Sequence, residues 1–230
     1  MLSGNPKIVP IDGRFGLKAK VYESLKCAIM NMNIYDEQAD LRINETHLSD
    51  KLGVSRNSLR EALSRLDQEG LVKIVPYRGT TIVRKTKAEI LEMITVWAAL
   101  ESMAARLITE HATNQEISSL RVLCSSFERE DNRPETCLDE YSDANILFHQ
   151  AILAISRSEL LNDMTQSMFM HLRAIRARTI CEKDRAARSV VDHVNIIEAL
   201  EARDTERAGR LVCEHNLNLK VHVERNVDID

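Results

Sequence analysis

The chain has 230 residues, of which 44% are hydrophobic and 29% charged, and its formal net charge is −4 at pH 7. This composition is typical of a globular protein and excludes a disordered chain. No apolar run approaches the roughly 20 residues of a membrane span, and the N-terminus lacks the apolar centre of a secretory signal, so we expect a cytoplasmic protein that does not enter a membrane.

The charges are unevenly distributed along the chain. Residues 1–85 contain 14 Lys and Arg against 10 Asp and Glu, whereas residues 86–230 contain 17 against 25. A positive first part and a negative second part indicate a polyanion-binding module followed by a domain with another task. The five cysteines are odd in number, widely spaced and free of any CxxC pair, so we expect reduced thiols and not a disulfide framework or a thiolate zinc site.

The first 70 residues predict three helices. Apolar residues recur at helical spacing over Leu17–Met32. Asn44 can cap a second helix that Gly53 ends, because glycine tolerates the left-handed conformation. Ser55 can cap a third helix, whose apolar face continues until Gly70 closes it. Two helices joined by a tight turn that contains glycine form a helix-turn-helix pattern.

The segment LVKIVPYRGTTIV, residues 71–83, predicts a small hairpin with a turn at residues 77–79. A helix-turn-helix followed by a hairpin is a winged helix, whose third helix enters the DNA major groove with its N-terminal residues toward the base edges. That end carries donors suited to guanine and phosphate, and the predicted contacts are Ser55, Arg56, Asn57, Ser58 and Arg60. The alternative is a winged helix used for protein contact, in which Arg56 and Arg60 are solvated charges.

The segment LSDKLGVSRNSLREALSRLDQEGLVKIVPYRGTTIV resembles the DNA-binding domain of GntR-type bacterial transcription regulators, through its LGVSR turn, its LREAL helix and its glycine-tipped wing. The resemblance covers residues 17–84 and implies a dimeric repressor or activator. In it Arg56 and Arg60 meet the operator, and Gly79, beside Arg78, lets the wing approach the minor groove.

Two departures from the GntR pattern precede and begin the second helix. The family commonly has a proline-glycine pair where this chain has Ala39 and Asp40. We expect this departure to be tolerated, because aspartate can adopt a positive φ at moderate cost. The family often has a basic residue early in the second helix, where this chain has Thr46 and His47. The phosphate or base contact of that basic residue therefore does not carry over directly to this chain.

From Lys87 onward the periodicity predicts only helices, and the segment 129–142, with Pro134, is predicted to be a polar loop. Asp204 is expected to start the last helix. The predicted fold is therefore mainly α, with a winged helix-turn-helix over residues 1–85 and an all-α bundle of about six helices over residues 86–230 that can hold a ligand. The predicted inward face of the first of these helices is Ile90, Met93, Ile94, Trp97, Leu100, Ala104 and Leu107.

The helical part resembles the FCD effector domain of the FadR subfamily of GntR regulators, most clearly in FHQAILAISRSELL and DHVNIIEALEARDTERAGRLVCEH. Many FCD proteins bind one metal ion through an aspartate, a histidine four residues later and two histidines on the last two helices. The resemblance carries these ligand positions to Asn145, His149, His193 and His215. The physics fits, because residues four apart share a helix face and two further helices can bring imidazoles to the same interior point.

Asn145 stands where the family usually has aspartate. Asp143 cannot easily replace it, because six residues of helix turn its side chain roughly 120° away from His149. A neutral amide ligand weakens the binding of hard ions, relatively favours Zn²⁺ or Ni²⁺, and leaves the site more attractive to an anionic effector. The alternative is that the three histidines are separately satisfied core residues.

The remaining predicted effector contacts are Trp97, His171, Arg173 and Arg176. Trp97 occupies a position where the family often has an arginine that holds acidic effectors, and it can instead form an aromatic wall, whereas an arginine-rich run is also typical of a solvated face. We expect a homodimeric regulator, not an enzyme, whose partners are operator DNA and a small organic acid. Two alternatives stay open: a purely structural helical dimerisation domain, and a metal hydrolase fused to a DNA-binding domain, for which the sequence has no HExxH motif and no evident general base.

Overall fold

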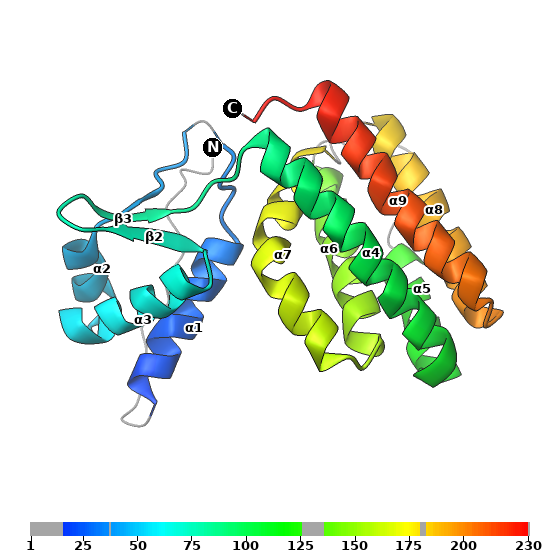
Figure 1. The fold of residues 1–230 in the computed structure, drawn as a ribbon, viewed down its shortest axis with the longest axis horizontal. Helices are drawn as coiled ribbons and strands as arrows, with labels where there is room; N and C mark the ends of the chain where they lie inside the picture. The colour runs from blue at the N-terminus through cyan, green and yellow to red at the C-terminus, as the bar shows by residue number, and fades with distance from the viewer. Residues whose placement is uncertain (1–15, 37, 126–135, 180–182, 230) are drawn as a thin grey trace. The chain divides into compact units, whose positions relative to one another are not determined.

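The computed structural model describes residues 16–36, 38–125, 136–179 and 183–229 (Figure 1). The chain forms two compact units, Met1–Lys85 and Thr86–Asp230. Helices dominate both units, and a small sheet belongs to the first. The expected mainly α fold, a winged helix-turn-helix followed by a helical domain, is confirmed.

The described part of the first unit contains three helices and three short strands. They are α1 (Leu17–Met30), β1 (Arg42–Ile43), α2 (Glu45–Leu52), α3 (Arg56–Gln68), β2 (Val72–Val75) and β3 (Gly79–Ile82). The strands form an antiparallel sheet in the order β1-β3-β2, in which Val75 pairs with Gly79 at the tip of the hairpin. Leu59, Ala62, Leu63 and Leu66 are buried on the inward face of α3, as the periodicity predicts.

The predicted helix caps of the first unit are confirmed. The Asn44 side chain accepts a hydrogen bond from the backbone N–H of His47, and the Ser55 hydroxyl accepts one from the backbone N–H of Ser58. Gly53 ends α2 with a φ of 65°, in the left-handed region that glycine enters without steric cost. Local sequence chemistry therefore determines the turn between α2 and α3.

Three details of the first unit differ from the sequence analysis or were missing from it. Helix α1 ends at Met30 and not at Met32. Strand β1 was not predicted, because two residues are too few to show an alternating pattern. Asp40 does not have a positive φ; its carboxylate instead accepts a hydrogen bond from the backbone N–H of Arg42 at 3.0 Å, so the turn forms without glycine.

The second unit contains six helices in its described part, as predicted. They are α4 (Lys87–His111), α5 (Asn114–Ser125), α6 (Thr136–Ile155), α7 (Glu159–Thr179), α8 (Lys183–Glu201) and α9 (Thr205–Asn226). The long helix α4 packs along α9 and also contacts α6 and α7, while α8 packs against α5 and α9 (Figure 1). The side chain of Asp204 caps α9, as predicted, by accepting from the backbone N–H of Arg207.

The predicted loop at 129–142 was wrong in its second half, because α6 already begins at Thr136. Its first half, with Pro134, lies outside the described residues. The described cysteines Cys27, Cys124 and Cys213 are free thiols, while Cys181 also lies outside. In the described part of the chain, no helix combines the length and the apolar character needed to cross a membrane.

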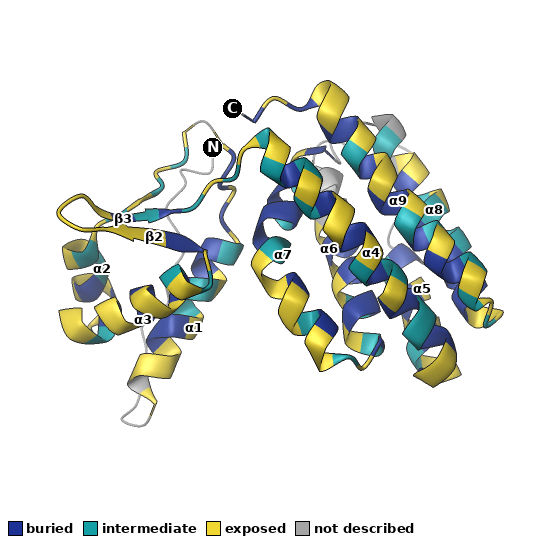
Figure 2. Ribbon diagram, in the orientation of Figure 1, coloured by how far each residue is buried: buried dark blue, intermediate teal, exposed yellow. Residues whose placement is uncertain are grey.

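The buried face of α4 differs from the predicted one. Buried residues follow the inner side of each helix in the bundle (Figure 2). Leu100 is only half-buried, whereas the charged neighbour Glu101 is completely buried. A buried carboxylate is costly unless polar groups surround it, and Glu101 therefore leads to the interior site of this unit.

Candidate functional site

The N-terminal end of α3 is the candidate DNA-binding surface of the first unit. Ser55, Arg56, Asn57 and Arg60 are exposed and Ser58 is half-buried, while the leucines of the helix point into the core. The hydroxyls of Ser55 and Ser58 lie 3.0 Å apart, which keeps both at the start of the helix. The structure thus presents on one surface the five side chains that the sequence singled out.

Arg60 is held in place by a partner that the sequence reasoning missed. Its Nε donates to Glu45 Oε2 at 3.0 Å, and the other oxygen of Glu45 accepts from the Thr80 hydroxyl at 3.2 Å. The Arg60 side chain nevertheless stays 67% exposed. Glu45 therefore connects the starts of α2, α3 and β3 and orients a guanidinium that remains accessible to a nucleic acid.

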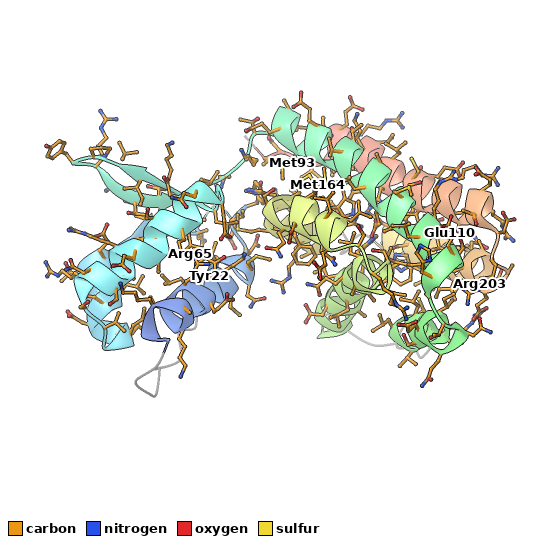
Figure 3. The ribbon with its side chains drawn as sticks, turned by 60° about the horizontal axis from the view of Figure 1, so that its bottom comes forward. Tyr22, Arg65, Met93, Glu110, Met164 and Arg203 are labelled. Carbon is orange, nitrogen blue, oxygen red and sulfur yellow. The ribbon has the colours of Figure 1, made fainter. Side chains whose placement is uncertain are left out.

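Arg65, further along α3, has a different role. Its guanidinium carbon lies 3.8 Å from the centre of the Tyr22 ring on α1, a close cation–π geometry (Figure 3). This arginine stabilises the packing of α1 against α3. The N-terminal end of α3 is thus the candidate for DNA recognition, whereas Arg65 nearer its C-terminal end contributes to packing.

The tip of the hairpin is exposed from Lys73 to Gly79, and this stretch includes the predicted contact Arg78. Gly79 has a φ of 96° and Tyr77 a φ of 63°, so the turn places two residues in the left-handed region. A side chain at Gly79 would be strained there, which explains the glycine at the tip of the wing.

The second unit brings together three of the predicted metal ligands. His149 of α6, His193 of α8 and His215 of α9 each offer a ring nitrogen, and these atoms all lie within 4.8 Å of one another. All three side chains are buried. The arrangement gives a histidine triad of the kind that binds divalent transition metals.

Carboxylates orient two rings of the histidine triad. His149 Nδ1 lies 2.7 Å from Glu101 Oε1, and His215 Nδ1 lies 3.0 Å from Asp192 Oδ2. Since a carboxylate accepts, each Nδ1 carries the proton and each Nε2 presents its lone pair. Hydrogen bonds of this kind fix the tautomer and orientation of metal-binding histidines in proteins.

His193 is fully buried, and neither of its ring nitrogens has a hydrogen-bond partner among the described residues. Its ring stacks on Phe148, with centroids 3.9 Å apart. Leaving a buried polar group unsatisfied costs about 1 to 3 kcal/mol. The donor set of the histidine triad therefore fits a metal ion or another ligand that would satisfy this imidazole.

Burial lowers the pKa of His149 and of His193 well below the ordinary value, and nearby charges, including the Arg176 guanidinium, lower both further. Burial also lowers the pKa of His215, although the hydrogen bond to Asp192 opposes this shift. The folded state therefore favours neutral imidazoles, the form that coordinates metals.

Asn145, the fourth predicted ligand, is buried on α6, and its amide oxygen accepts a hydrogen bond from the Ser189 hydroxyl at 3.3 Å. Asp143 is exposed and lies 3.8 Å from Arg173, so it does not replace the missing carboxylate, as expected. Arg173 is half-buried on α7 and faces Asp143, and its role as an effector contact stays a prediction.

A closed ring of hydrogen bonds joins four buried residues, which we call the buried ring: Glu101, His149, Arg176 and Asn216. Glu101 accepts from His149 and, at 2.7 Å, from the amide nitrogen of Asn216. Arg176 donates from one nitrogen to His149 Nε2 and from another to the amide oxygen of Asn216, both at 2.5 Å. The indole nitrogen of Trp97 donates to Glu101 at 3.0 Å.

Sequence reasoning missed Glu101 and Asn216 as members of the interior site. Burial raises the pKa of Glu101 above its ordinary value, and the Arg176 charge and the hydrogen bond from Asn216 oppose this shift only in part. Burial lowers the pKa of Arg176 to about 10, so the guanidinium stays charged at neutral pH. One signal was visible: Trp97 and Glu101 are four residues apart, which places them on one helix face.

A cavity of about 610 Å³ lies between α8 and α9. Its lining includes His215 of the histidine triad and Asp192, together with three arginines, Arg185, Arg188 and Arg225. The predicted effector contacts Trp97, His171, Arg173 and Arg176 are not among its lining residues. Trp97 and His171 are instead buried. The cavity is thus basic, and it connects to the triad through His215.

Comparisons with known proteins cover both units. A family model described as bacterial regulatory proteins, gntR family, matches residues 17–82, and the FCD domain model matches residues 92–218. The Nta operon transcriptional regulator of Aminobacter aminovorans is 31% identical over 189 residues, which are 82% of this chain and 85% of the relative. The HTH-type transcriptional repressor GlaR of Escherichia coli (strain K12) is 28% identical over 203 residues, 85% of this chain and 90% of that protein.

Solved structures show the same fold. A transcriptional regulator GntR described as putative, from Rhodococcus sp. RHA1, aligns with a TM-score of 0.72 at 20% identity, over 92% of this chain and 99% of that one. McbR/YncC of E. coli aligns with a TM-score of 0.70, also at 20% identity, over 92% of this chain and 100% of that one. The relatives are named as transcription regulators and not as enzymes, in agreement with the sequence expectation.

Proposed function

This chain belongs to the gntR family of bacterial transcription regulators and carries an FCD domain, and we propose that it binds palindromic operator DNA as a homodimer in the cytoplasm under the control of a small organic acid. We further propose that it belongs to the FadR subfamily, which its FCD domain supports. One winged helix reads each half-site, and two-fold symmetry of the protein is matched by two-fold symmetry of the operator.

The exposed end of α3 supports the DNA contact. Arg56, Asn57 and Arg60 supply donors for base edges and phosphates, and Arg78 at the wing tip supplies another charge. Arg60 is already oriented by Glu45, which reduces the entropy lost when it binds DNA. Binding weakens as salt rises, because phosphate contacts release counterions.

We propose that the histidine triad and Asn145 hold one Zn²⁺ or Ni²⁺ ion. The observation that carries this proposal is His193, a fully buried imidazole without a hydrogen-bond partner in the described part of the chain, beside two imidazoles already oriented by carboxylates. A bound ion supplies an open coordination position for a carboxylate oxygen of the effector. The arginines of the adjacent cavity attract that anion electrostatically.

The effector acts by binding one arrangement of the dimer more tightly than the other. A coupling free energy of about 1 to 3 kcal/mol changes the affinity for DNA by several-fold to about a hundredfold. The ligand therefore needs only a small difference in its contacts between the two arrangements to regulate transcription.

The test combines DNA selection with elemental analysis of the purified protein. Selection from a random DNA pool should enrich a two-fold symmetric sequence, and light scattering should give the mass of a dimer. Purified protein should contain roughly one transition metal ion per chain. His193→Ala should lose this ion, whereas His111→Ala, at an exposed histidine of α4, should keep it.

Different outcomes separate the parts of the proposal. A protein that selects symmetric DNA but retains no metal and responds to no small acid has a purely structural helical domain. A protein that enriches no DNA sequence contradicts the operator-binding function itself.

A further inference from the structure

The buried ring places a cation on an atom that a metal ion also needs. The single proton of neutral His149 is on Nδ1, which donates to Glu101, so Nε2 carries the one available lone pair. Arg176 donates into this lone pair at 2.5 Å. A lone pair that accepts from a guanidinium cannot at the same time coordinate a metal, so Arg176 and the metal exclude each other at Nε2.

The guanidinium is well held in this position. Its second nitrogen donates to Asn216, whose amide in turn donates to Glu101, so both fork nitrogens are used within a closed ring. Arg176 is buried and still charged at neutral pH, and the Glu101 carboxylate provides the nearby negative charge. A metal ion therefore has to displace an arginine that is already well satisfied.

Displacement also changes the charge of the site. With a divalent ion present, the buried groups carry two positive charges from the ion and one from Arg176, against one negative charge from Glu101. The imidazoles, Asn145 and Asn216 are neutral, and charges buried in protein are only weakly screened. An anion in contact with both cations removes this repulsion, and the guanidinium fork matches a carboxylate in bidentate geometry.

We propose that Arg176 competes with a metal ion for Nε2 of His149. The metal ion displaces the guanidinium, and a carboxylate of the effector then binds the released guanidinium. Metal and acid therefore bind with positive coupling. The inference rests on the metal site proposed above. It assigns to Arg176 a positioning role before binding and an anion-binding role afterwards.

The test is calorimetric titration of Zn²⁺ into the metal-stripped, full-length protein. Arg176→Met, which has no donor, should bind Zn²⁺ roughly tenfold more tightly than wild type. Arg176→Lys keeps the charge but cannot donate to His149 and Asn216 through a rigid fork, so its affinity should lie between these two. The matched control is Arg178→Met, an exposed arginine on the same helix, which should bind like wild type.

The effector arm of the test uses succinate as a carboxylate probe. Succinate should raise the Zn²⁺ affinity of wild type, and by linkage Zn²⁺ should raise the succinate affinity by the same factor. Arg176→Met should show a clearly smaller enhancement, because only the ion is then left to bind the carboxylate. No enhancement in wild type, or an equal enhancement in Arg176→Met, overturns the coupling.

Two results overturn the displacement while leaving the metal site intact. One is an equal Zn²⁺ affinity for wild type and Arg176→Met. The other is an Arg176→Lys variant with the same Zn²⁺ affinity as wild type, because any effect of Arg176→Met then comes from charge alone. This second result also tests the displacement if the Arg176→Met variant does not fold. An absence of Zn²⁺ binding in wild type and in both Arg176 variants overturns the proposed metal site and this inference together.

Discussion

Replacing Glu101 by glutamine should strongly destabilise the helical unit. The carboxylate is completely buried and accepts hydrogen bonds from Trp97, His149 and Asn216. Glutamine keeps the shape but turns one acceptor into an NH₂ donor that faces these N–H groups, and it leaves Arg176 without a buried counter-charge. Removing one of two buried charges that compensate each other costs up to about 3 to 5 kcal/mol, because the other is left without its counter-charge.

The measurement is urea unfolding of the metal-stripped protein, followed by circular dichroism. The control is Glu110→Gln on the same helix, at an exposed glutamate, which should change the free energy of unfolding by at most about 0.5 kcal/mol (Figure 3). The double variant Glu101→Gln with Arg176→Met should recover part of the loss, because both charges are then gone. A Glu101→Gln variant as stable as Glu110→Gln would refute the reasoning that the Glu101 carboxylate compensates the buried charge of Arg176.

Four further predictions concern residues of both units. Burial lowers the pKa of His193 below its unfolded value of about 6.5, so the unfolded chain binds protons first as the pH falls. Below pH 6.5 the free energy of unfolding should therefore fall by up to about 1.4 kcal/mol per pH unit for each such histidine. His193→Gln should flatten this pH dependence in urea titrations. Arg56→Ala should weaken binding to the selected operator by about 1 to 3 kcal/mol without changing the melting temperature, as fluorescence anisotropy and thermal scans will show. Gly53→Ala should cost about 1 kcal/mol of stability and Gly53→Asn less, because φ is 65° there, and equal melting temperatures of these two variants would contradict the strain. Asn145→Asp should bind Zn²⁺ at least tenfold more tightly in calorimetric titration.

Local signals in the sequence were sufficient for the helix caps of the first unit. Asn44, Gly53 and Ser55 were recognisable because a cap or a left-handed glycine depends on neighbours within three or four residues. Strand β1 escaped, since it exists only by pairing with β3. The Arg60–Glu45 ion pair was not predicted for a similar reason, because its two residues lie on different helices and are fifteen positions apart in the chain.

The interior of the helical unit shows the limit of periodicity more clearly. The amphipathic pattern placed Leu100 inside and ignored Glu101, but the structure buries Glu101 and leaves Leu100 half-exposed. One helical position corresponds to a rotation of about 100°, so a small error in the stripe exchanges neighbours. The carboxylate is stable there only because α6, α7 and α9 contribute His149, Arg176 and Asn216, which no local pattern reveals.

The Asn145→Asp prediction follows from the charges around the histidine triad. With asparagine, the charges of a divalent ion, Arg176 and Glu101 sum to +2, since Glu101 offsets Arg176 and the amide is neutral; Asp192, half-buried beside His215, adds one negative charge at the edge of the site. An aspartate would lower this sum by one and add a charged ligand, and its oxygen would still accept from Ser189. Metal binding should therefore become tighter and less dependent on an acid.

The control for this variant is Asn218→Asp, which adds the same charge at an exposed residue lining the adjacent cavity. It should leave the Zn²⁺ affinity close to that of wild type, because solvent screens a charge at that position. If Asn145→Asp and Asn218→Asp changed the Zn²⁺ affinity equally, Asn145 would not be a ligand. If only Asn145→Asp tightened binding and reduced the effect of succinate, the natural asparagine would be what makes the metal site depend on its acid.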